Sequence, residues 1–167
     1  MINWLRRLWA TIESTVSPRY FYQISGRWLP WFAWPAVLLI ATGLVWGLAI
    51  APADYQQGNS YRIIFIHVPA ASLAMGGYLL LAICGAITLI WRVKTAEMVA
   101  KAAAPVGALF CLMALLTGSL WGKPTWGTYW VCDARLTSML IFLFLYFGVL
   151  ALQNAFEEIS QGSKAAA

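Results

Sequence analysis

Long runs without a charged side chain alternate along this sequence with short polar segments. Four of these runs cover residues 28–53, 63–91, 102–122 and 136–156. A helix that crosses the hydrocarbon layer of a bilayer needs about 20 apolar residues, and each run reaches that length. The pattern therefore predicts an all-α fold, a polytopic membrane helix bundle with four transmembrane helices.

Turn-forming residues and prolines predict where these helices begin and end. Residues 51–61 are rich in loop formers, and a proline disfavours helical geometry in the residue before it, so we expect the second membrane helix to begin at Pro69. We expect a short inner loop at residues 92–101 and an end of the third span at Trp121, before a glycine and a proline. The fourth span is rich in leucine and phenylalanine, which is typical of a lipid-facing anchor.

The first span is expected to begin near Trp28, after a segment that lies on the inner membrane surface. Residues 2–13 place apolar side chains on one helical face, which predicts a short interfacial helix. A partly ordered basic tail is the alternative. The end of the first span, Ala49-Ile50-Ala51, resembles a signal-peptide cleavage site. Because the apolar run exceeds the ~7–15 residues of a signal peptide, we interpret it as a retained helix.

Composition supports a membrane protein, and the distribution of charge predicts its orientation. Of the 167 residues, 62% are hydrophobic and 10% are charged, and the mean hydropathy is +0.72. The net charge of +5 does not indicate nucleic acid, because eight of the 11 lysines and arginines precede the first span, separate the second from the third or follow the fourth. The positive-inside rule then predicts that both termini are cytoplasmic. We expect an N-terminal cytoplasmic segment (1–27), a four-span domain (28–156) and a cytoplasmic tail (157–167).

The remaining connections share the outer face, and one of them, the tryptophan-rich loop at residues 121–135, carries a dense aromatic cluster. The cluster contains Trp121, Trp126, Tyr129 and Trp130. Rings this close predict a platform that holds a planar macrocycle by stacking and apolar burial. An aromatic belt at the membrane surface is the alternative.

Polar side chains near the same face are candidate ligands. His67 is the single histidine, and imidazole is a common axial ligand of haem iron. A hydrogen-bonded histidine at the membrane boundary is the alternative. Arg62 and Arg135 offer guanidinium groups that bind carboxylates, and Asp133 would orient one of them. In the alternative interpretation these charges only pair with one another near lipid headgroups.

Small residues on the second span predict close contact with another helix. They are Ala70, Ala71, Ala74, Gly76, Gly77 and Gly85. Cys84 and Cys111 lie inside spans, and Cys132 lies alone on the outer side. We therefore expect neither a disulfide framework nor a cysteine metal site.

The tryptophan-rich loop also resembles a known family. Residues 126–133 read W-G-T-Y-W-V-C-D, similar to the signature W-G-x-x-W-x-W-D (the WWD motif) of proteins that handle haem in cytochrome c-type biogenesis. With the flanking residues 121–124 and 134–138, and with Arg62 and His67-Val68-Pro69 upstream, nearly the whole chain resembles the haem exporter protein C (CcmC) family.

The resemblance implies a protein that holds haem b as cargo at the periplasmic face of the bacterial inner membrane and delivers it to the haem chaperone CcmE. It implies no enzymatic activity. The further partners that it implies are the ABC transporter subunits CcmA and CcmB and the small membrane protein CcmD. The resemblance implies that His67 is an axial ligand of the haem iron. It implies that the platform rings are Trp121, Trp126, Tyr129 and Trp130, and that the polar contacts are Asp133, Arg135 and Arg62.

This chain departs from the family pattern in two important ways. Cys132 stands where the signature has its last tryptophan. The family also has six spans and a second histidine in the outer loop between spans five and six. We therefore expect the chain to be a fragment of a longer protein or a degenerate copy, and to bind haem weakly or not at all by itself.

The residues leave two other functions open. The first is a permease or scaffold subunit of an ABC transporter complex, which the absence of charged residues inside the spans disfavours. The second is a membrane thiol oxidoreductase that uses Cys132. It is disfavoured because no resolving cysteine stands at CxxC spacing.

Overall fold

The computed structural model describes residues 17–155. The predicted interfacial helix at residues 2–13 and the tail at residues 157–167 lie outside the described residues. The described part contains helices and no strand. Four helical segments in it are long and apolar enough to cross a membrane, namely Pro18–Ile50, Asn59–Trp91, Lys94–Trp126 and Ala134–Ala155. The prediction of four spans is confirmed.

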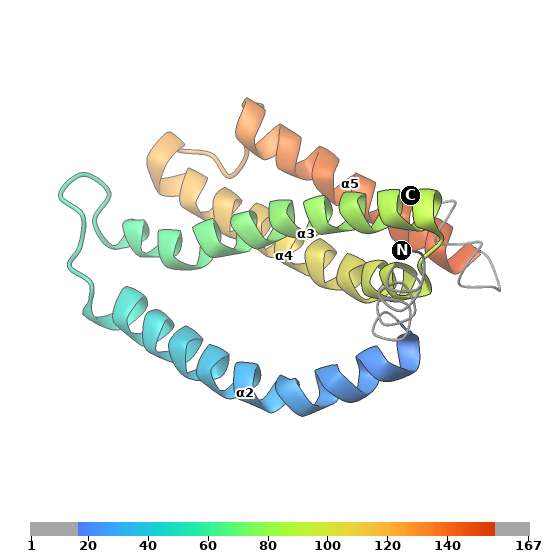
Figure 1. Cartoon of the computed structure of the whole chain (residues 1–167). Coiled ribbons are helices and arrows are strands. Elements are labelled where there is room, and N and C mark those ends of the chain that lie inside the picture. The colour runs from blue at the N-terminus through green and yellow to red at the C-terminus, as the bar shows by residue number, and fades with distance from the viewer. Residues whose placement is uncertain (1–16, 156–167) are drawn as a thin grey trace, which may run out of the picture.

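The first span consists of α2 (Pro18–Val45) and a π-helical continuation, η1 (Trp46–Ile50). The helix that contains this span begins at Pro18, ten residues before the predicted start of the span near Trp28, because a proline at the first helical position is compatible with a helix and the arginines that follow it are exposed. Prolines inside α2 each remove a backbone hydrogen bond, and the helix is bent (Figure 1). None of its residues is buried, and α2 makes few contacts with α3 and α4 and lies apart from them over most of its length (Figure 1).

The predicted loop after the first span is confirmed, and Asp54 holds it in shape. The Oδ1 atom of Asp54 accepts hydrogen bonds from the backbone N–H groups of Gln56 and Gln57 at 2.9 Å and 2.8 Å. The Asp54 backbone pairs with that of Gly58, whose φ of 58° is a left-handed value that glycine adopts without strain. A 3-10 turn, η2 (Asn59–Ile63), then leads into α3 (Ile64–Trp91).

Two predicted helix starts are wrong. Helix α3 already contains Pro69, because a proline near the beginning of a helix removes one backbone hydrogen bond at most and the preceding turn continues into the helix. The predicted inner loop at residues 92–101 is reduced to two residues, since α4 (Lys94–Trp126) begins at Lys94. Arg92 ends α3 abruptly by adopting a φ of 55°.

The third span also extends past its predicted end at Trp121. Gly122 and Pro124 lie inside α4, because each costs a membrane helix little where neighbouring groups satisfy the backbone. The helix ends where Gly127 takes a φ of 77°, a conformation that few other residues adopt. The connection to α5 (Ala134–Ala155) is therefore shorter than predicted, at residues 127–133.

Helix α4 packs against both α3 and α5. The contact is close because the buried residues of α4 are mostly alanine and glycine. The predicted small-residue surface of α3 has its partner here: a methyl group at Gly77 would lie 3.6 Å from the Cα of Gly107 on α4. The interpretation of the fourth span as a lipid-facing anchor is wrong for one face of α5, which buries Leu136, Leu143, Tyr146 and Gln153.

The connections at residues 51–58 and 127–133 lie at the same end of the bundle, and the turn between α3 and α4 lies at the other (Figure 1). The start of α2 and the end of α5 lie at the same end of the bundle as the turn between α3 and α4 (Figure 1). The prediction that the two loops share one face is therefore confirmed.

Candidate functional site

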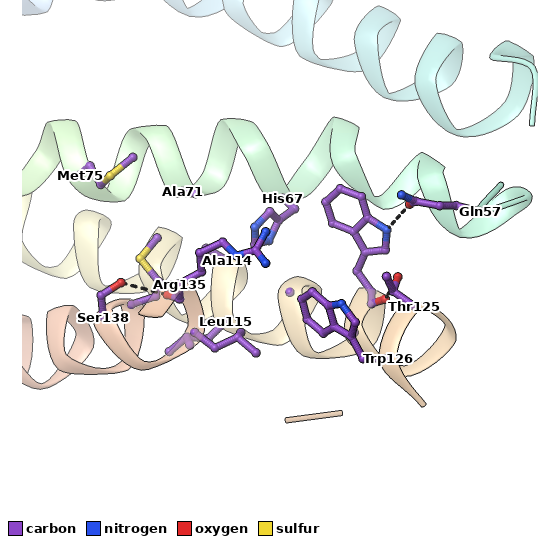
Figure 2. Close-up of a pocket in the computed structure, with 15 residues that line it drawn as sticks. Gln57, His67, Ala71, Met75, Ala114, Leu115, Thr125, Trp126, Arg135 and Ser138 are labelled. Atoms are coloured by element: carbon purple, nitrogen blue, oxygen red, sulfur yellow. Dashed lines mark hydrogen bonds between the residues drawn. The ribbon is translucent and has the colours of Figure 1, made fainter. Parts of the chain in front are cut away.

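A cavity of about 590 Å³ lies at the loop-bearing end of the bundle. Helices α3, α4 and α5 and the loop before η2 contribute its walls, which are mostly apolar, and Figure 2 shows these residues. The lining residues that carry a polar group or an aromatic ring are Gln57, His67, Trp121, Thr125, Trp126, Arg135 and Ser138. Its volume is in the range of small-molecule and cofactor sites, about 300–1,000 Å³.

His67 stands on the wall that α3 contributes, near the start of that helix. Its Nδ1 atom lies 3.1 Å from the hydroxyl oxygen of Thr117 on α4. The ring packs so closely on α4 that a methyl group at Gly118 would lie 3.0 Å from its Cε1 atom. The indole of Trp121 meets the imidazole edge to face, with ring centroids 5.9 Å apart and planes at 71°. Helix α4 therefore fixes the orientation of this single histidine.

Trp121 is fixed in turn by the loop before η2. Its indole Nε1–H donates a 2.8 Å hydrogen bond to the Oε1 atom of Gln57, drawn in Figure 2. The backbone of Gln57 is held by the Asp54 carboxylate. The loop therefore contributes one side chain to the wall of the cavity, and that side chain holds the Trp121 ring in place.

Trp126 and Arg135 form the opposite rim of the cavity. The guanidinium carbon of Arg135 lies 5.5 Å from the centroid of the Trp126 ring, which is within the range of a cation–π contact. The Nε–H of Arg135 donates to the Oδ2 atom of Asp133 at 3.1 Å, and the arginine side chain is 81% exposed. A cationic, solvent-reaching group therefore stands beside an indole at the mouth of an apolar cavity.

Asp133 shapes this rim without lining the cavity. Its Oδ1 atom accepts the backbone N–H of Leu136 at 2.9 Å, which caps the start of α5. The pKa of Asp133 lies below its ordinary value, first because of this backbone hydrogen bond and also because Arg135 donates to the same carboxylate. The predicted pairing of Asp133 with Arg135 is present, and the carboxylate orients the arginine.

The other predicted site residues lie outside the cavity wall. Arg62 donates to the backbone carbonyl oxygens of Leu48 at 3.0 Å and Ala51 at 2.8 Å, so it ties η2 to the end of the first span. Tyr129 and Trp130 lie in the loop after α4 and are 56% and 39% exposed. The structure thus brings His67, Trp121, Trp126 and Arg135 together and leaves Arg62, Tyr129, Trp130 and Asp133 around them.

Sequence reasoning missed Gln57 and Thr117. The signal for Thr117 was its position one helical turn before Trp121, which places both on one face of α4. Gln57 offered no signal beyond its place in a turn-rich loop. Its contact with Trp121 joins the loop before η2 to the end of α4, which only the folded chain brings together.

The cysteines do not form a reactive pair among the described residues. All three are free, with Cys84 and Cys111 buried in α3 and α4 and Cys132 exposed in the loop after α4. The described part also holds no group of three histidine, cysteine or acidic side chains arranged to bind a metal ion.

Four apolar helices define a multi-pass helical membrane protein, and three of them enclose a cavity lined by imidazole, indole and guanidinium groups. A family model described as "Heme exporter protein C" matches residues 11–167. The chain belongs to this family.

Curated relatives agree with this assignment. The heme exporter protein C of Escherichia coli K12 is 51% identical over 159 residues, which cover 95% of this chain and 65% of that protein. The proteins of the same name from Haemophilus influenzae and Bradyrhizobium diazoefficiens are each 49% identical, over 159 and 157 residues, and this chain covers 65% and 59% of them. The chain therefore spans less than two thirds of the length of these relatives.

Proposed function

We propose that this chain is the haem-holding part of a haem-delivery protein of cytochrome c-type biogenesis. Its membership in the heme exporter protein C family supports this function. The observation that carries it is the position of His67, the single histidine, on the wall of a cavity that also holds two indole rings and a guanidinium group.

The residues of the cavity fit haem b as cargo. The contact of the His67 ring with Thr117 uses Nδ1, which leaves Nε2 as the atom that would coordinate iron. Trp121 and Trp126 supply apolar rings for a porphyrin face. Arg135 stands at the mouth, where its charge would attract a propionate carboxylate. Large apolar area and one charged rim group match the chemistry of an amphipathic macrocycle.

Four further residues are proposed to assist from outside the cavity wall. Tyr129 and Trp130 extend the aromatic surface beyond the mouth, and their exposure suits contact with cargo or with a partner. Asp133 orients Arg135. Arg62 contributes a polar contact or holds the loop that carries Gln57, and its Nε is buried without a hydrogen-bond partner among the described residues.

The proposed activity is transfer of cargo, not enzymatic catalysis. Several moderate contacts suit this role, because a carrier that binds very tightly releases its cargo slowly. We propose CcmE as the recipient and CcmA, CcmB and CcmD as membrane partners. The exposed apolar surface of α2 supports a helix that contacts lipid or such partners.

The proposed location is the bacterial inner membrane, with both termini in the cytoplasm and the cavity at the periplasmic end. The bias of arginine and lysine toward the connections at the opposite end supports this orientation. The proposed organisation is a four-span domain at residues 28–156 between the cytoplasmic segments 1–27 and 157–167.

A titration of the purified chain with haemin, followed by its Soret absorbance, tests the function. We expect weak, saturable binding, because this chain supplies one imidazole. His67→Ala should weaken binding by about 10-fold or more, and Trp126→Ala should weaken it less. Trp34→Ala is the matched control, since it removes a tryptophan that is 70% exposed on α2 and lies outside the cavity wall. Equal affinities of the wild-type and His67→Ala chains would overturn the proposal.

A further inference from the structure

We propose that Thr117 is a positioning residue that keeps His67 in the tautomer with a proton on Nδ1, so that Nε2 presents its lone pair to the cavity. The assignment of the tautomer stands on the geometry of α3 and α4. Its consequence for haem binding rests on the function proposed above.

The hydroxyl of Thr117 has a single hydrogen and has a better acceptor for it than the imidazole. Its Oγ1 atom lies 2.7 Å from the carbonyl oxygen of Met113, one turn earlier in α4, and 3.2 Å from that of Ala114. The 2.7 Å distance is typical of an O–H···O hydrogen bond, and threonine in a helix commonly donates to the carbonyl of residue i−4. The Thr117 hydroxyl therefore donates its hydrogen to the backbone carbonyl oxygen of Met113.

The contact between Thr117 and His67 must then run in the opposite direction. Oγ1 retains lone pairs, and at 3.1 Å from Nδ1 it has the spacing of an acceptor for an N–H donor. A neutral imidazole carries one proton, so a proton on Nδ1 leaves Nε2 unprotonated. Thr117 thus selects one of the two tautomers by what its oxygen can accept.

Packing against α4 holds the His67 ring in its hydrogen bond to Thr117. The Cε1 edge of His67 lies against Gly118, where no Cβ stands in its way, and the Trp121 indole meets the imidazole edge to face. A flip of the ring, which exchanges Nδ1 with Cδ2 and Cε1 with Nε2, would place a carbon beside Thr117 and break this hydrogen bond. Contacts from about one turn of α4, at Thr117, Gly118 and Trp121, therefore hold the ring in one orientation.

A fixed tautomer matters because metals bind the unprotonated nitrogen. In metal sites, the second nitrogen of a ligating histidine is held by a hydrogen-bond acceptor, and loss of that acceptor typically weakens metal binding by about 10- to 100-fold. A hydroxyl whose own hydrogen is directed to the backbone meets this requirement without adding a charge inside the membrane.

The single histidine makes the tautomer directly measurable. Chain labelled with 15N-histidine contains one imidazole, and its two nitrogen resonances in the haem-free protein report which atom is protonated. We expect the Nδ1–H form in the wild type, a shift toward the Nε2–H form in Thr117→Val, and recovery of the wild-type spectrum in Thr117→Ser. The matched control is Thr42→Val, because Thr42 donates to Leu38 at the same 2.7 Å and lies on α2.

Haemin titration of the same variants separates this proposal from the function. Thr117→Val should weaken haemin binding by about 10-fold, while Thr117→Ser and Thr42→Val stay near the wild type. A wild-type spectrum with Nε2–H, or a Thr117→Val spectrum equal to that of the wild type, would overturn the role of Thr117. Correct tautomers without any haemin binding by the wild type would overturn the proposed function instead.

Discussion

The hydroxyl of Tyr146 on α5 donates a 2.6 Å hydrogen bond to the backbone carbonyl oxygen of Ala74 on α3. The phenol reaches α3 by crossing α4 at Gly107, where a Cβ would collide with its ring. Tyr146 is fully buried and also meets Tyr78 of α3 edge to face, with ring centroids 5.3 Å apart. One side chain thus joins all three packed helices.

Tyr146→Phe should destabilise the bundle, because it removes this interhelical hydrogen bond and keeps the ring. Such bonds in membrane proteins contribute about 0.6 kcal/mol on average and up to about 1.7 kcal/mol, and the buried geometry suggests the upper part of that range. Unfolding of the purified chain by titration with a denaturing detergent measures the change.

Tyr78→Phe is the control for this measurement. It removes the same atom from a neighbouring tyrosine whose hydroxyl makes no hydrogen bond within the described part of the chain. We expect a smaller loss of stability than in Tyr146→Phe. Equal stabilities of the two variants would show that the contact with Ala74 contributes nothing.

Gly118→Ala should move the His67 ring without removing any side chain that is proposed to bind haem. The added methyl would lie 3.0 Å from Cε1 of His67 and 3.3 Å from Cδ2 of Leu136, and contacts this short force the neighbours to shift. We expect lower haemin affinity in a titration followed by Soret absorbance. Gly43→Ala on α2 is the matched control, since a methyl there meets nothing within 4 Å. If both variants bind haemin like the wild type, the close packing of His67 on α4 has no role in binding.

The number of spans and the shared face of the loops could be predicted from the sequence. Membrane insertion depends on long uncharged runs and on the distribution of charge, and both are visible in the sequence. The sequence did not predict that α4 continues through Gly122 and Pro124, since local breaking tendencies compete with packing that the sequence does not display. For the same reason, the contacts of His67 with Thr117 and of Trp121 with Gln57 could not be predicted. They join segments far apart in the chain. The candidate residues were therefore easier to predict than the polar groups that orient them.

Asp133 should make the start of α5 sensitive to acid. Its pKa is lowered in the folded chain by the Leu136 N–H and by Arg135, so the ionised form is the one that the fold favours. Its contribution to stability is complete above the ordinary carboxyl pKa of about 3.9 and is lost as the pH falls through the lowered pKa of the folded state. Thermal unfolding between about pH 6 and pH 2 should show this loss.

Asp133→Asn tests the origin of that acid sensitivity. The amide oxygen still caps α5, but it has no charge to lose, so the variant should show a smaller fall in stability on acidification. Asp133→Ala should lose the cap at every pH. An Asn variant that responds to acid as strongly as the wild type would assign the effect to another group.

Cys132 allows the proposed orientation to be tested with a natural thiol. It is exposed in the loop after α4, whereas Cys84 and Cys111 are buried in helices. A maleimide that does not cross membranes should therefore label Cys132 from outside intact spheroplasts. The matched variant Cys132→Ser/Arg92→Cys moves the exposed thiol to the turn between α3 and α4, and it should react only after the membrane is permeabilised. Because both thiols flank the same helix α4 at opposite ends, the reverse pattern would place the cavity on the cytoplasmic side and exclude delivery to a periplasmic chaperone.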